Sequence, residues 1–366
     1  MRILTRYILR EYLVPLFYCL TGFVSIYVLF ELFGSFARLS KAKLPFLTTV
    51  DYFAAYLAPF FEWIAPAALM LAALYTMWSF CRHSELIAMR ASGVSFLAIS
   101  APILGVAALM AAVVWGVNNE YVPARAQWAR LMKTEEFDLA KIAAADNLVY
   151  RNTAEGRTWT VTKMEDGDPS RLLDVKIVFD RPGGGARLAT VTAERADFLD
   201  GEWWLTGAET IHYDTKGAEC VSPTPELDAV RFRPLADVDE EPADFAMQNR
   251  DWAYNSVAER LRFLRTRKNL SPELRRKYVY DTWAKILSPF ACIIITLFSI
   301  PAGVATGRQS VFAGILGALG MFFGFATLTI LSMVGADTGW LPPVFAAFLP
   351  HVVFLALGVR AFLKQR

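Results

Sequence analysis

Long apolar runs with very few charges occupy both ends of this 366-residue chain. They extend from the N-terminus to about residue 117 and from about residue 283 to the C-terminus, whereas most charged residues lie between 118 and 281. A helix needs about 20 apolar residues to cross a bilayer, and several of these runs are that long. The pattern therefore predicts a membrane protein with one large soluble domain inserted between two membrane parts.

We expect six spans, three before the soluble domain and three after it. They are placed at about 12–33, 52–80, 96–117, 283–304, 311–334 and 341–362. Pro15 is expected in the first turn of the first span, where proline is tolerated. A cleaved signal ending near residues 34–37 is the alternative to an uncleaved first span. The mean hydropathy of +0.34 and the 55% of hydrophobic residues agree with a membrane protein.

The middle section, 118–281, changes to short segments with β-branched or aromatic residues near every second position. RTWTVTKM at 157–164 and ARLATVTAERADFLD at 186–200 show this alternation, which is typical of strands with one buried face. RPGGG at 181–185 is expected to form a hairpin turn, since no helix signature follows it. We therefore predict an inserted all-β, jelly-roll-like domain with helical links at both ends. Its large aromatic residues, expected mainly in the core, are Trp159, Phe179, Phe198, Trp203 and Trp204.

Several functional classes are disfavoured by composition and spacing. Cys19, Cys81, Cys220 and Cys292 lie too far apart for a CxxC pair, so neither a zinc site nor a disulfide framework is expected. No Walker A motif, GxSxG or HExxH occurs in the sequence. The net charge of +2 comes from interleaved acidic and basic residues and does not indicate nucleic-acid binding. We expect no catalytic residue, no metal and no cofactor in this chain, so any ATP would be hydrolysed by another subunit.

Basic residues in short loops predict the orientation, because such loops are retained in the cytoplasm. An inner N-terminus places on the cytoplasmic side Arg2, Arg6, Arg10, Arg82, Arg90, Arg308, Arg360, Lys364 and Arg366. Both termini are then cytoplasmic and the large domain is periplasmic. Arg38, Lys41 and Lys43 would remain on the outer side, against this rule, and need a separate explanation.

The segment SELIAMRASGVS, 84–95, interrupts the apolar sequence between the second and third spans. Ser84 is a suitable N-cap, Glu85 would lie in the first turn, and Gly93 is placed to end the helix. A helix of about two turns, roughly 12 Å long, is too short to span and would lie at the cytoplasmic surface.

This segment resembles the loop between the second and third spans of the lipopolysaccharide-export permeases, the LptF/LptG (YjgP/YjgQ) family. WAKILSPFACIIITLFSIPAG at 283–303 resembles the family's fourth span, and GWLPPVFAAFLPHVVFLALG at 339–358 its sixth. DFLDGEWWLTGAE at 197–209 resembles a strand pair of its periplasmic domain. The fourth-span and EWWLTGAE segments favour the LptG side of the family over LptF.

The resemblance implies a permease subunit of an ABC exporter in the inner membrane of a Gram-negative bacterium, which extracts lipopolysaccharide and passes it to a periplasmic bridge. The chain would comprise membrane helices in 1–117, the periplasmic domain in 118–281 and membrane helices in 282–366. Its expected partners are a homodimeric cytoplasmic ATPase (LptB-like) that binds ATP and Mg, a sister permease (LptF-like or LptG-like) forming a pseudo-symmetric heterodimer, a single-span periplasmic bridge protein (LptC-like), and lipopolysaccharide.

Candidate site residues follow from this picture. Coupling to the ATPase is assigned to Glu85, Leu86, Met89, Arg90 and Gly93. Arg38, Lys41 and Lys43 could bind the phosphates of the lipid, although snorkelling to ordinary headgroups is equally compatible with their positions. Cavity or gate positions are Glu31, Glu62, Gly317, Gly320 and Gly324, with the glycines suited to close helix packing.

Two other classes of function remain open. A proton-coupled secondary transporter could use Glu62 and His351, and a mechanotransmitting ABC protein would move no substrate through itself. The division of six spans into three and three argues against the latter. Lys285, near the start of the fourth span, is expected to be an interfacial anchor.

Overall fold

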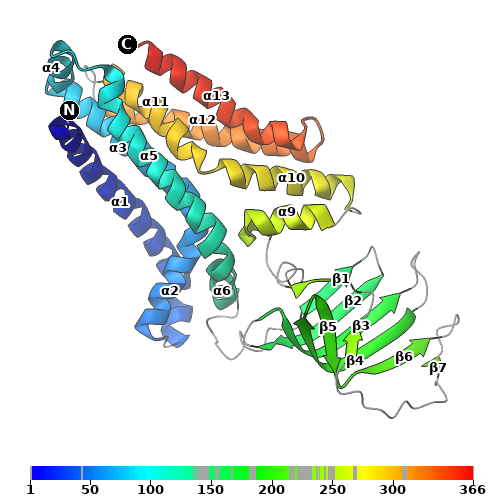
Figure 1. Cartoon of the computed structure of the whole chain (residues 1–366). Coiled ribbons are helices and arrows are strands. Elements are labelled where there is room, and N and C mark those ends of the chain that lie inside the picture. The colour runs from blue at the N-terminus through cyan, green and yellow to red at the C-terminus, as the bar shows by residue number, and fades with distance from the viewer. Residues whose placement is uncertain are drawn as a thin grey trace. The chain divides into compact units, whose positions relative to one another are not determined.

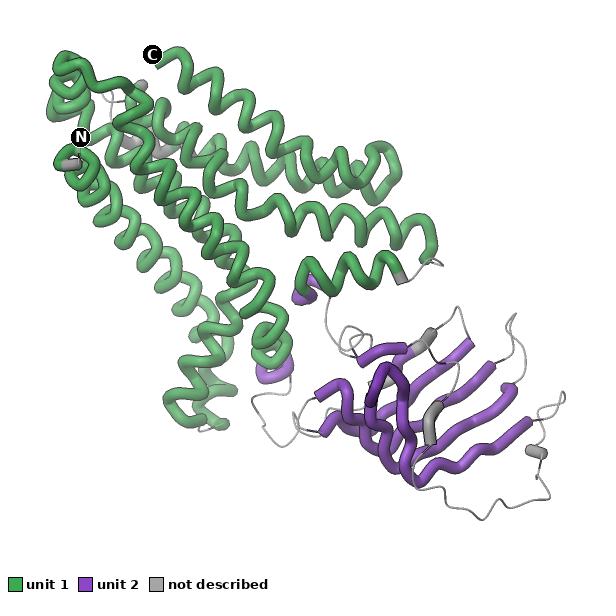
Figure 2. The backbone as a smooth tube through the Cα atoms, in the orientation of Figure 1, with its two compact units in different colours: residues 1–130, 256–366 green, residues 131–255 purple. Residues whose placement is uncertain are grey.

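The computed structural model describes residues 2–42, 44–134, 137, 148–152, 156–165, 168–180, 187–213, 219–220, 233–235, 238, 240–242, 245, 252–266, 270–306 and 311–365. The chain divides into two compact units (Figure 2). One, here called the membrane unit, comprises Met1–Arg130 and Ser256–Arg366. The other, here called the β unit, comprises Leu131–Asn255. The β unit is thus inserted into the sequence of the membrane unit, as the charge distribution predicted.

The membrane unit is helical (Figure 1). Its helices are α1 (Arg2–Ala42), α2 (Phe46–Leu57), α3 (Phe61–Arg82), α4 (Glu85–Ala91), α5 (Phe96–Gly116), α6 (Val122–Thr134, which runs into the β unit), α9 (Val257–Thr266), α10 (Pro272–Leu287), α11 (Phe290–Thr306), α12 (Val311–Asp337) and α13 (Pro343–Leu363). Within the described residues, five continuous helical segments are long and apolar enough to cross a bilayer. The pair α10 and α11, bent by 55°, makes a sixth if it counts as one broken span. The structure therefore confirms five of the six expected spans, and all six if the bent pair is one span.

Two details of the spans differ from the sequence prediction. Helix α1 begins at Arg2 and has 41 residues, so Pro15 lies in the helix interior and the prediction of a first-turn proline is wrong. At 1.5 Å per residue such a helix is about 60 Å long, roughly twice the hydrocarbon thickness. The fourth span is broken between α10 and α11, because Pro289 lacks the backbone N–H that would continue the helical ladder. The start expected at residue 283 falls inside α10.

Helix α3 lies at the centre of the membrane unit. Its buried residues are spread around the whole helix, and it packs against α1, α5 and α11. A close approach between α3 and α11 is possible because Gly303 has no side chain. A Cβ atom added there would lie 2.7 Å from the backbone oxygen of Leu74 and 2.8 Å from the Cβ of Met77. This contact positions the broken fourth span against the second span.

The β unit is built on an antiparallel sheet of eight short strands within the described residues. The strands are β1 (Leu148–Asn152), β2 (Arg157–Met164), β3 (Arg171–Asp180), β4 (Arg187–Leu199), β5 (Glu202–Thr206), β6 (Glu209–Tyr213), β7 (Glu219–Cys220) and β8 (Arg233–Leu235). Their order is β1-β2-β3-β4-β5-β8, and the long strand β4 also pairs with β6, which pairs with β7. The predicted inserted β domain is confirmed. RPGGG lies outside the described residues, and the strands on either side of it pair up to Asp180 and Arg187.

Aromatic rings fill the core of the β unit. Trp159 from β2 and Trp203 from β5 are fully buried, and both pack against the buried ring of Phe245. Beneath them, Arg157 and Glu240 form a buried ion pair with 3.1 Å between Nε and Oε1. Phe179 and Phe198 are partly buried against the same core. Trp204, the neighbour of Trp203, points to the other face of the sheet and is half-buried.

Candidate functional site

Helix α4 is the short surface helix that the sequence placed between the second and third spans. It has seven residues, and Figure 1 shows it at the end of the membrane unit that also holds both chain termini. Phe96, the first residue of α5 after this segment, packs on Phe362 near the end of α13, with ring centroids 4.9 Å apart. The segment is therefore anchored on several spans at once.

The two ends of α4 differ in how they are capped. Ser84 is the N-cap residue, as predicted, and its carbonyl oxygen accepts a bond from the N–H of Ala88, but it has a left-handed conformation with φ of 62° and its side chain makes no capping bond. The C-terminal end agrees with the prediction. Gly93 has φ of +88°, and its N–H donates to the carbonyl of Arg90 while the N–H of Val94 donates to the carbonyl of Met89. These two hydrogen bonds form the Schellman motif, in which glycine supplies the left-handed residue.

The faces of α4 divide the predicted coupling residues into two groups. Leu86 is buried in the core formed by α1, α3 and α5, and Met89 packs partly against that core. Arg90 is exposed, as is Ile87 with 61% of its surface accessible. Leu86 and Met89 thus hold α4 in place, whereas Ile87 and Arg90 form the surface that a partner could contact.

Glu85 is bonded within the chain. The hydroxyl of Tyr7 donates to Oε2 of Glu85 over 2.7 Å, and the Tyr7 ring stacks on Phe80 with centroids 6.0 Å apart. These contacts join the first turns of α1, the end of α3 and the start of α4. A displacement of α4 would therefore act on α1 and α3 together. No local sequence pattern signals a bond between residues 78 positions apart.

The basic residues expected on the outer side lie at the far end of α1. Arg38 is half-buried and Lys41 is exposed in its last turns, while Lys43 lies outside the described residues. Exposed aromatic side chains precede them on the same helix, with Phe30, Phe33 and Phe36 each more than 60% accessible. A lipid has both apolar chains and phosphates, so this end of α1 offers surfaces for both parts.

Glu31 is a buried carboxylate at that end of α1. Its Oε1 accepts hydrogen bonds of 2.8 Å from the hydroxyls of Ser35, one turn on, and of Tyr52 in α2. Only 5% of Glu31 is exposed, so these donors offset part of the cost of burying the charge. The arrangement attaches α2 to α1.

Glu62 belongs to a second polar cluster, between the residues that follow α5 and the break between α10 and α11. Nδ2 of Asn118 donates to Oε2 of Glu62 over 3.0 Å and approaches the Ser288 hydroxyl at 3.5 Å. Asn118 lies in a π-helical turn, Val117–Tyr121, a distortion that often marks functional positions. Lys285 is 8% exposed, so its predicted role as an interfacial anchor is wrong.

His351 is buried elsewhere in the membrane unit. Its Nδ1 lies 3.2 Å from the carbonyl oxygen of Ala347, and its ring meets Phe325 edge to face. Among the described residues, no hydrogen bond connects His351 to Glu62.

The three glycines of α12 that were assigned to the cavity or gate make no tight contact with the described residues. Gly317 and Gly320 have open space where a Cβ would be, and Gly324 would only meet the ring of Phe354 at 3.5 Å. The close helix contact is made instead by Gly303 on α11. Sequence spacing identified a stripe of small residues but could not show which glycine faces a neighbouring helix.

The comparison with protein families agrees with these features. The model of the family "Lipopolysaccharide export system permease LptF/LptG" matches residues 6–364, nearly the whole chain. It covers both sides of the family, so the preference for LptG stays a prediction. No individual curated protein matched the chain. The helical spans, the inserted antiparallel β unit and this match together place the chain in the LptF/LptG family of lipopolysaccharide export permeases, which are multi-pass inner-membrane transport proteins and not enzymes.

Proposed function

We propose that this chain is one membrane subunit of an ABC exporter that extracts lipopolysaccharide from the inner membrane. It pairs with a sister permease, and a homodimeric ATPase binds on the cytoplasmic side, where α4 and both termini lie. Closure of the cavity between the two permeases, powered by ATP, moves the lipid toward the periplasm. The β unit receives it there and passes it to a single-span bridge protein by pairing of sheet edges.

Helix α4 carries this proposal. A seven-residue helix held between two spans by Leu86 and a bond to Tyr7 can transmit a push from a soluble partner into the membrane unit. Its exposed face presents an apolar side chain, Ile87, beside a cation, Arg90. An apolar anchor flanked by a charge suits a groove on a partner protein.

In this proposal, Arg38 and Lys41 bind the phosphates of the lipid substrate. Arg38 contributes a fork of donors that matches a phosphate, and Lys41 contributes a point charge. Phe30 and Phe33, whose rings are 81% and 80% exposed on the same helix, supply apolar surface for acyl chains. Lys43 is expected to add a third charge.

Variants of α4 test the coupling role. The permease pair and its ATPase are reconstituted in nanodiscs, and lipopolysaccharide extraction is measured together with ATP hydrolysis. Ile87→Asp and Arg90→Glu alter the exposed face and should abolish ATPase copurification or reduce it at least tenfold, because a buried interface tolerates neither an unpaired carboxylate nor a reversed charge. The matched control is Arg10→Glu, which reverses an exposed charge on α1 and leaves α4 unaltered.

Variants at Glu85 test transmission separately from binding. Glu85→Gln with Tyr7→Phe removes the link between α4 and α1 and should leave ATPase binding intact while lowering extraction per ATP hydrolysed. Normal extraction and normal assembly in all the α4 and Glu85 variants would refute the coupling role. Extraction that needs no ATPase and stops when the proton gradient collapses would favour the secondary transporter instead.

A further inference from the structure

An exposed face of α13 forms a groove near the end of the membrane unit that holds α4 and both termini. Its volume is about 690 Å³, and its lining residues are Val352, Leu355, Ala356, Val359, Arg360, Leu363 and Lys364. Every described residue that lines it belongs to α13 or to the residue directly after it. The lining includes no residue of α4 and none of the basic end of α1, so the groove is not part of the site described above.

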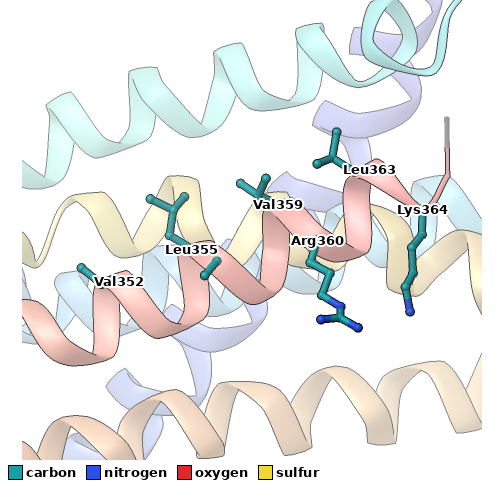
Figure 3. Close-up of a pocket in the computed structure, with 7 residues that line it drawn as sticks. Val352, Leu355, Val359, Arg360, Leu363 and Lys364 are labelled. Atoms are coloured by element: carbon teal, nitrogen blue, oxygen red, sulfur yellow. The ribbon is translucent and has the colours of Figure 1, made fainter.

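Two neighbouring rows of side chains shape the groove. Leu355, Val359 and Leu363 recur every four residues and form an apolar row, as Figure 3 shows. Val352, Ala356, Arg360 and Lys364 also recur every four residues and form the second row, which is apolar at its start and basic at its end. Ala356 has the smallest side chain of the set. The groove therefore has an apolar floor that leads to two cations.

The two cations are available for an external anion. Helix α13 contains no Asp or Glu, and both Arg360 and Lys364 are exposed. Neither forms an ion pair with a carboxylate in the part of the chain that the structure describes. Figure 3 shows both side chains extending to the same side of the helix, one turn apart. Two adjacent cations at that spacing suit a single phosphate group.

The length of the groove matches one leaflet of a bilayer. From Val352 to Lys364 the helix rises through 12 residues, which corresponds to about 18 Å. One leaflet contributes about 15 Å of hydrocarbon. A phosphate held at Arg360 and Lys364 would thus allow an acyl chain to lie over Ala356 toward Val352.

We propose that this groove binds an anionic phospholipid of the leaflet in which α4 lies, with its phosphate on Arg360 and Lys364 and one acyl chain along Ala356 and Val352. Basic residues near the cytoplasmic end of a membrane helix attract anionic headgroups. Ordinary snorkelling would place the two cations at headgroup depth but would not retain one lipid class in a hollow. The proposal stands independently of the role in lipopolysaccharide export.

The test measures lipid retention by the full-length chain in its native complex. The complex is assembled in nanodiscs of equal parts phosphatidylglycerol and phosphatidylcholine, and lipids that stay bound are counted by native mass spectrometry. Phosphatidylglycerol should be retained over phosphatidylcholine. In Arg360→Gln/Lys364→Gln the preference should fall about tenfold or more, since each cation near a membrane surface contributes several-fold to anionic lipid binding.

Two further variants separate the groove from charge alone. Arg6→Gln/Arg10→Gln removes two exposed cations from α1 at the same end and should keep the preference. Ala356→Leu fills the hollow without altering any charge and should lower retention. Because Ala356 is exposed, this change leaves the helix packing intact.

Four outcomes would overturn the proposal. They are equal retention of the two phospholipids, an equal loss in the α1 control, retention that Ala356→Leu does not change, and recovery of the glycolipid substrate from the groove. A photoreactive residue at position 356 supplies a last check. It should label phospholipid, and labelling of the sister permease would mean that a protein surface covers the groove.

Discussion

Both units bury aromatic residues, but the membrane unit also leaves large aromatic residues exposed. In the β unit, Trp159 and Phe245 have no exposed surface. In the membrane unit, Phe30 and Phe33 of α1 are 81% and 80% exposed. Water drives large rings into the core of the β unit. A lipid environment gives the membrane unit no such drive, since its solvent is as apolar as the side chains.

Different interactions must therefore hold each unit together. The β unit depends on burial of its rings, whereas the membrane unit depends on close backbone approach at Gly303 and on buried polar bonds such as those of Glu31. The substitutions below are ordered from the largest expected effect to the smallest, and each one asks whether this division holds.

Removing a ring from the β core should have the largest effect. Trp159→Ala leaves a cavity among Trp203, Phe245 and Tyr150 and should lower the free energy of unfolding of the β unit by about 3–5 kcal/mol. Amide hydrogen exchange in β2 to β4 of the full-length chain measures this loss. Trp204→Ala is the control, because Trp204 is half-buried on the opposite face, and it should lower the free energy of unfolding clearly less. Equal losses would mean that the core rings do not dominate.

Adding one methyl group between α3 and α11 should come next. In Gly303→Ala the new Cβ would meet the backbone oxygen of Leu74 at 2.7 Å, so the helices must separate, at a cost of about 1–3 kcal/mol. The midpoint of thermal unfolding in nanodiscs should fall. Gly105→Ala on α5 is the matched control, because nothing lies within 4 Å of its Cβ position, and its midpoint should not fall. A drop of equal size in both variants would contradict close packing at Gly303.

Local sequence patterns were sufficient to predict most of the spans and the main strands, although not the full length of α1 or the break in the fourth span. Charge-poor runs of about 20 residues predict spans because each residue of a membrane helix must be tolerated by lipid. Alternation of β-branched and aromatic residues in 157–164 and 186–200 predicts strands because one face of a sheet is buried. Gly93 was identifiable as a helix end for a similar local reason.

Contacts between distant residues were not predictable in this way. The bond from Tyr7 to Glu85 and the contact of Gly303 with Leu74 depend on how the helices pack, and many residues of the same types lie elsewhere in the chain. The short helix that carries the candidate site was therefore predictable as a segment, but the burial of Leu86 and the exposure of Ile87 could be told apart only in three dimensions.

Loss of one donor to Glu31 should have a moderate effect. Tyr52→Phe removes a 2.8 Å bond to a buried carboxylate while keeping the ring, and should lower stability by about 1–2 kcal/mol. The thermal midpoint of the full-length chain in nanodiscs measures the loss. Tyr18→Phe is the control, since Tyr18 is 70% exposed on the same bundle and its change should be near zero. If the two variants melt alike, the buried bond does not hold α2 to α1.

An exposed polar contact on the β unit should matter least. The backbone N–H and hydroxyl of Ser170 both donate to Oδ1 of Asp168, over 2.9 and 2.6 Å, and these bonds lower the pKa of Asp168 below its usual value. Ser170→Ala removes the hydroxyl bond, so the pKa of Asp168 should rise toward about 3.9. Water competes for such exposed groups, so the loss of stability should stay below about 0.5 kcal/mol.

The sign of the pH dependence distinguishes this contact from an unrelated effect of the substitution. Because the pKa of Asp168 is lower in the folded chain than in the unfolded chain, the bond stabilises above the unfolded pKa, and that contribution is lost as the pH falls through the folded pKa. The difference in the free energy of unfolding between the unaltered chain and Ser170→Ala should therefore be present at neutral pH and vanish in strong acid. The carboxyl chemical shift of Asp168 gives its pKa, and denaturant unfolding at both pH values gives the stability. A difference that persists in acid would show that the serine acts through packing, and that the exposed face of the β unit is stabilised by more than solvent-screened polar bonds.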